Sequence, residues 1–171
     1  MSDGARGGLA AARALRDGSA IVFRRNWSAR ASLARVIDAT RLELTPQLHP
    51  LITRVESLRE QGFSSECVLH ELVPLGPLRI PNKYRAARRV LEASAVYARI
   101  ELDAWASLGV HLRHELTLRA EGERTDVSHS VRVTAPRVLR AFVARTAQRA
   151  HDAWVQRVVG WAERERGEEA G

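Results

Sequence analysis

Four polar side chains, two of them imidazoles, interrupt otherwise aliphatic faces of predicted strands in the chain. His114 and His129 replace aliphatic residues in alternating patterns, and Tyr84 and Asn82 do the same in an earlier segment. A few oriented polar groups in an apolar wall are typical of a small-molecule site. An imidazole there can remove a proton next to a carbonyl group, while a tyrosine hydroxyl donates to the developing oxyanion.

Two other interpretations of these residues stay open. The histidines can hydrogen-bond a ligand head group without catalysing a reaction. Each polar side chain can also be a core residue that is satisfied by a neighbour, a backbone group or a buried water. His114, His129 and Tyr84 are therefore catalytic candidates, while the sequence contains no nucleophile motif, glycine-rich phosphate loop or paired carboxylates.

A metal site is not expected, and no cofactor is predicted. His111 and His114 are three residues apart, which on a strand places them on opposite faces of the sheet. We find no cysteine or carboxylate that would complete a tetrahedral ligand set with His114 and His129.

Turn residues divide residues 51–135 into segments of ten to fourteen residues with β-type patterns. Six such segments in succession indicate an antiparallel meander, and an earlier β-branched and aromatic segment, 19–27, brings the number of strands to seven. Two short helices are expected between them, one beginning at Ser28 as its cap and one over 42–48. The six segments are 51–60, 64–73, 78–91, 95–106, 110–120 and 124–135.

The pairing of the last two strands follows from the turn at Gly122. It places Leu116 opposite His129 and gives the sheet one charged face and one mostly apolar face, on which both histidines lie. A turn at Ala93 would likewise set Arg85 opposite Glu101, so that much of the arginine is matched across strands.

One long amphipathic helix is predicted over 137–166, with Pro136 at its start and Gly167 after its end. Phe142 and Trp154 lie on its apolar stripe and are expected to face the sheet. Together with Leu102 and Leu116 from the strands, they complete the predicted ligand-binding residues. The full set is Tyr84, Asn82, His114, His129, Leu102, Leu116, Phe142 and Trp154.

Composition limits the other classes of function. The chain has 171 residues and a formal net charge of +7, carried by 26 arginines and one lysine. This excess of arginine resembles a coding bias more than a phosphate-binding surface, so nucleic-acid binding is not favoured. One cysteine, the lack of a long apolar run and the lack of a signal-peptide core favour a cytoplasmic protein. We expect a monomer or a homodimer.

The order of elements and the C-terminal pattern carry a family resemblance. The sequence at 27–30 (WSAR), the stretch APRVLRAFV at 135–143 and the stretch AHDAWVQRVVGWAE at 150–163 resemble the START-like, or SRPBCC, helix-grip superfamily, closest to its bacterial polyketide cyclase/dehydrase and lipid-transfer group. The resemblance implies an α+β fold in which a seven-stranded curved antiparallel sheet wraps around the long C-terminal helix. It covers one domain, 19–166, between a flexible arm, 1–18, and a disordered tail, 167–171.

The resemblance also implies a hydrophobic cavity between sheet and helix. We therefore expect the protein to bind a lipid, polyketide, quinone or similar molecule as a carrier or sensor. The alternatives are a polyketide aromatase/cyclase or dehydratase that uses a pocket histidine, and a basic module that binds a protein or the ribosome.

Overall fold

The computed structural model describes residues 15–17 and 20–164, and nearly all of the predicted arm and the whole predicted tail lie outside these residues. One antiparallel sheet contains all the strands of the described residues, in the order β1-β2-β8-β7-β6-β5-β4-β3. The strands are β1 (Leu15–Asp17), β2 (Ala20–Ala29), β3 (Ile52–Gln61), β4 (Ser64–Leu75), β5 (Leu78–Ala93), β6 (Tyr97–Trp105), β7 (His111–Glu121) and β8 (Arg124–Thr134).

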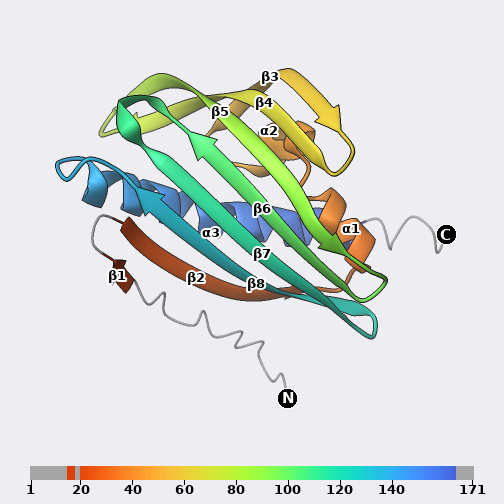
Figure 1. Ribbon diagram of the computed structural model, residues 1–171. Helices are drawn as coiled ribbons and strands as arrows, with labels where there is room; N and C mark the ends of the chain where they lie inside the picture. The colour runs from red at the N-terminus through yellow and green to blue at the C-terminus, as the bar shows by residue number, and fades with distance from the viewer. Residues whose placement is uncertain (1–14, 18–19, 165–171) are drawn as a thin grey trace.

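The predicted helix-grip architecture is confirmed. Strands β2 to β8 are the seven expected strands, and the three-residue β1 adds one more at the edge beside β2. Two short helical segments follow β2, and the long helix α3 (Arg140–Arg164) lies across the inner face of the curved sheet (Figure 1). The short segments are α1 (Leu33–Asp38) and the 3₁₀ turn η1 (Leu42–Leu44), which leads directly into α2 (Thr45–Leu48).

Two predicted helix starts are wrong. The segment at Ser28 remains in β2, because its pairing with β8 continues to Ala29 opposite Thr125, and Ser32 caps α1 instead by accepting a hydrogen bond from the backbone N–H of Arg35. The long helix begins at Arg140 rather than at residue 137, after a turn in which the N–H of Leu139 donates to the carbonyl of Pro136.

The predicted register of β7 and β8 is confirmed. Leu116 lies opposite His129, and Gly122 occupies the turn with a φ of 63°, a backbone conformation that glycine adopts without strain. Because side chains alternate between faces, His114 and His129 both point towards α3.

The predicted register of β5 and β6 is wrong by four residues. Arg89, not Arg85, lies opposite Glu101. The hairpin closes later than expected, since β5 continues to Ala93 through a bulge after Val90, and the Ser94 hydroxyl oxygen accepts hydrogen bonds from the turn. An even shift keeps each side chain on its face but moves it along the sheet.

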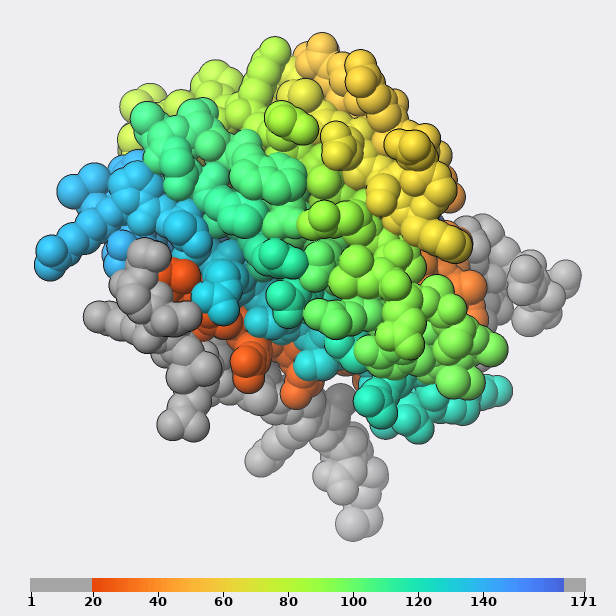
Figure 2. All heavy atoms as spheres, in the orientation of Figure 1, coloured from red at the N-terminus to blue at the C-terminus, as the bar shows by residue number. Residues whose placement is uncertain are grey.

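Bulges and ion pairs shape the space between sheet and helix. Register shifts occur in the β3/β4 and β5/β6 pairs, where bulges bend and twist the strands. Arg25 on β2 holds α3 through an ion pair with Asp152 at 2.8 Å, and the backbone N–H of Arg30 donates to Glu163. Figure 2 shows side chains of the strands covering the face of the sheet that points away from α3.

The largest apolar core lies at one end of this space. Val158 and Ala162 of α3 pack there with Ile100, Leu116 and residues of α1. This core anchors the C-terminal half of α3 against the sheet. No helix in the described part of the chain combines the length and apolar character needed to cross a bilayer.

Candidate functional site

A cavity of about 500 Å³ lies between the sheet and the N-terminal half of α3. Its wall is mostly apolar, and it also receives polar groups from β4, β5, β7, α2 and α3. The apolar wall includes Leu69, Leu102, Leu112, Phe142, Val143 and Trp154.

Six of the eight predicted ligand-binding residues line this cavity, and two do not. The six are Asn82, Tyr84, Leu102, His114, Phe142 and Trp154. Leu116 is fully buried in the apolar core beside Ile100, and His129 is buried next to His114, outside the lining. Leu102 lies opposite Arg88, whereas the predicted register, with Arg85 opposite Glu101, would place it opposite Tyr84.

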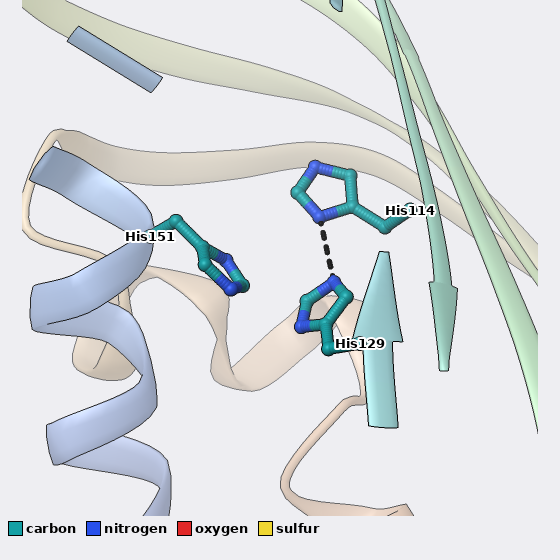
Figure 3. Close-up of side chains that lie close together, drawn as sticks. All are labelled: His114, His129 and His151. Atoms are coloured by element: carbon teal, nitrogen blue, oxygen red, sulfur yellow. Dashed lines mark hydrogen bonds between the residues drawn. The ribbon is translucent and has the colours of Figure 1, made fainter. Parts of the chain in front are cut away.

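The structure brings a third imidazole to the two predicted ones. His114 of β7, His129 of β8 and His151 of α3 form a compact group, hereafter the histidine cluster (Figure 3). Nδ1 of His114 lies 3.2 Å from Nε2 of His129, and the rings of His129 and His151 are 4.2 Å apart and nearly perpendicular. The prediction that no metal site exists rested on the lack of a third donor, which His151 supplies.

His151 was not among the predicted site residues, although its place in the helical pattern could have indicated it. His151 follows Ala147 by four residues and precedes Trp154 by three, so it belongs to the same stripe of the long helix. It is 3% exposed and stacks against Trp154 with ring centroids 5.5 Å apart. The aliphatic pattern alone did not draw attention to a histidine within that stripe.

Burial keeps the cluster uncharged at neutral pH. Desolvation lowers the pKa of His114 to about 4, against an opposing effect of Asp103. The pKa of His151 falls to about 2 through burial and the nearby His114, Arg25 and His49. Burial is the largest cause that lowers the pKa of His129 well below its usual value, and the nearby His151 and His114 lower it further.

A second polar group lies on β4 and β5. Nδ2 of Asn82 donates to Glu71 at 3.4 Å, and Oδ1 of Asn82 accepts from the Ser107 hydroxyl at 3.3 Å. Burial raises the pKa of Glu71, and it raises the pKa of Tyr84 together with the charges of Glu71 and Cys67. The cavity therefore disfavours charge on these groups.

His49 at the end of α2 is another lining residue that was not predicted. Its Nδ1 accepts the backbone N–H of Leu51 at 3.3 Å. Burial, followed by the charges of His114 and Arg157, lowers its pKa to about 3.

His111 lies apart from the histidine cluster. It stacks on Trp105, with ring centroids 5.4 Å apart and planes nearly parallel, and its Nε2 lies 2.8 Å from Oδ1 of Asp103. The alternation of side chains along β7 therefore separates His111 from His114, as the sequence predicted.

No model of a protein family matches the sequence, and no curated protein is similar enough to count as a match. Solved structures do match. The Zhui aromatase/cyclase from a Streptomyces species superposes with a TM-score of 0.68 at 18% identity, over 85% of this chain and 94% of that one.

Two further solved structures extend the likeness. The STAR-related lipid transfer protein from Xanthomonas axonopodis gives a TM-score of 0.61 at 13% identity, over 86% of this chain and 98% of that one. Truncated norcoclaurine synthase from Thalictrum flavum gives 0.54 at 11% identity, over 85% and 96%. At these identities the likeness establishes the architecture: the chain has the START-like helix-grip fold, close to that of the polyketide aromatase/cyclases.

Proposed function

We propose that the protein binds an apolar small molecule in the cavity between the sheet and α3, as a carrier or sensor. The observation that carries this proposal is the cavity of about 500 Å³ with its mostly apolar wall. Ligand sites for small molecules usually have volumes of roughly 300 to 1,000 Å³ and a few oriented polar groups. The aromatase/cyclase and the lipid transfer protein of this fold support the same class of ligand.

The polar groups narrow the chemistry of that ligand. Desolvation raises the pKa of Glu71 and lowers the pKa values of His49, His114 and His151, so burial shifts each of these groups towards its neutral form. A charged ligand group would meet the same penalty. We therefore expect a neutral, largely hydrocarbon or aromatic ligand with oxygen atoms that accept hydrogen bonds, such as a quinone, a polyketide or a neutral lipid.

A cyclase or dehydratase is the second candidate, favoured by the imidazole of His114 at the cavity wall. General bases work best when their pKa lies near the operating pH. Since the pKa of His114 is lowered to about 4, its imidazole is a weak base at neutral pH. Binding therefore ranks above catalysis in our proposal.

Filling the cavity tests the proposal directly. Ala147 of α3 lines the cavity, whereas Ala141 of the same helix is exposed and outside the lining. Ala147→Trp should weaken binding of neutral naphthalene probes by at least about tenfold, because the indole occupies the ligand volume. Ala141→Trp places the same indole on the surface and should leave the probe affinity unchanged.

Native mass spectrometry of the purified protein provides a second, independent test of the proposed function. We expect a bound neutral lipid or polyketide in the wild type and its loss in Ala147→Trp. Equal probe affinities for the wild type and both variants would contradict the proposal. Turnover of a polyketide substrate that His114→Leu abolishes would move the cyclase to first place.

A further inference from the structure

The histidine cluster has the arrangement of a metal-ligand set. Its three residues come from β7, β8 and α3, and each offers a ring nitrogen such that the three atoms lie within 4.8 Å of one another. Figure 3 shows the imidazole of His151 facing those of His114 and His129 across the space between helix and sheet. Residues from three separate elements thus converge on one point.

Hydrogen bonds among the described residues do not account for the cluster. Nε2 of His151 is buried and has no hydrogen-bond partner there, and this side chain is 3% exposed. Leaving a buried polar atom without a partner costs roughly 1 to 3 kcal/mol. A cluster that served packing alone would be more stable with apolar residues at these positions.

The spacing suits a shared divalent ion. Zinc binds histidine nitrogen at about 2.0 to 2.1 Å, so two nitrogens on one tetrahedral ion lie about 3.4 Å apart. Nδ1 of His114 and Nε2 of His129 are 3.2 Å apart, and the ring nitrogen that His151 offers lies within 4.8 Å of the other two ligand atoms, so it has to move closer by up to about 1.4 Å to share one ion. We propose that His114, His129 and His151 bind a divalent transition-metal ion, with zinc as the best match to imidazole ligands and tetrahedral geometry.

The fourth coordination position would open towards the cavity. His114 and His151 both line it, and three protein ligands with one open position are the pattern of catalytic rather than structural zinc sites. Three neutral imidazoles leave the ion's full positive charge uncompensated. The metal-loaded protein therefore selects a hydroxide or an anionic oxygen of a ligand, such as an enolate or a carboxylate. The metal-free cavity, in contrast, prefers a neutral ligand.

The surroundings of the ligands set the strength of the site. Ligating histidines usually donate their second ring nitrogen to a carboxylate or carbonyl, and loss of that partner costs about 10- to 100-fold in metal affinity. Nδ1 of His129 has no such partner among the described residues. We therefore expect micromolar affinity for zinc rather than the tighter binding of structural sites.

Titration with the metal alone tests the inference, whatever organic ligand the cavity takes. The protein is prepared without a polyhistidine tag, treated with a chelator and titrated with Co²⁺ and, by calorimetry, with Zn²⁺. We expect one equivalent of Co²⁺ to produce the intense visible absorption of a tetrahedral site, and Zn²⁺ to displace it. His151→Gln and His129→Gln each remove one proposed ligand. Each should weaken metal binding by at least about 10- to 100-fold, the effect of losing only the hydrogen-bond partner of a ligating histidine.

The matched control is His70→Gln, since His70 is paired with Glu56 on β3 and β4, away from the cluster. It should bind both ions like the wild type. Circular dichroism checks the fold of each variant, and His114→Gln replaces any variant that does not fold. Absence of saturable binding below about 1 mM, or equal affinities for the wild type and His151→Gln, would overturn the inference while leaving the apolar-ligand proposal standing.

Discussion

Nδ1 of His114 and Nε2 of His129 lie 3.2 Å apart on adjacent strands, but only His114 reaches the cavity wall. We expect His114→Leu to weaken binding of a naphthalene probe that carries a carbonyl group by roughly two- to tenfold, the contribution of one hydrogen bond. His129→Leu should also alter binding, through the position of the His114 ring. Fluorescence titration in buffer with a chelator measures both effects without a metal contribution.

His111→Leu is the control for that titration, because His111 stacks on Trp105 away from the histidine cluster. It should leave the probe affinity unchanged. Equal effects of His111→Leu and His114→Leu would mean that the probe does not bind where the cavity lies.

Trp154 connects α3 to the sheet and to the histidine cluster. It is 9% exposed and packs edge-on against Trp27 and against His129. Trp154→Ala should lower the free energy of unfolding by about 3 to 5 kcal/mol, as large truncations in a core do. Trp105→Ala, at an exposed tryptophan, should cost below about 1 kcal/mol in the same denaturant melts. A loss below about 1 kcal/mol for Trp154→Ala would refute its anchoring role.

The stability of the protein should fall as the pH decreases below about 6.5, in part because of His49. Burial lowers its pKa from 6.5 to about 3 in the folded state, next to His114 and Arg157. Between these pKa values the unfolded chain binds a proton that the folded chain excludes, so one such group removes up to about 1.4 kcal/mol per pH unit. Above pH 6.5 the imidazole of His49 is neutral in both the folded and the unfolded protein, so this group then causes no loss of stability.

Urea melts at pH 7 and pH 5 of the wild type and His49→Gln test this linkage. Glutamine does not titrate in this range, so the variant should lose less stability between the two pH values than the wild type. Equal losses would show that His49 is protonated as readily in the folded as in the unfolded protein.

Arg89 should matter more for stability than Arg85 on the same strand. Nη2 of Arg89 lies 2.9 Å from buried Asp103 and 3.5 Å from buried Glu101. Arg89→Met leaves these carboxylates with fewer partners and should cost about 2 kcal/mol, less than the 3 to 5 of a fully buried pair because the arginine is 46% exposed. Arg85 has an exposed pair with Glu66, so Arg85→Met should cost below about 1 kcal/mol. The opposite ranking would favour the register in which Arg85 faces Glu101.

The local sequence pattern was sufficient to predict that the strands exist and to predict part of the candidate site. Alternation and the turn at Gly122 placed His114 and His129 on one face, since a two-strand ladder and its turn determine which side chains lie opposite each other. The same reasoning placed Arg85 opposite Glu101 and was wrong there. A bulge after Val90 and a later turn at Ser94 shifted the ladder, and neither has a strong signature in the sequence.

Only the tertiary structure decided where along the sheet each residue of α3 lies. The apolar stripe of the helix contains Ala147, His151 and Trp154 at compatible spacings, but its periodicity does not determine where along the sheet the helix lies. That position results from the packing of Val158 in the core and from the ion pair of Arg25 with Asp152. Because helix-to-sheet docking depends on contacts between residues far apart in the chain, the meeting of His151 with the two strand histidines follows from the fold and not from the local sequence.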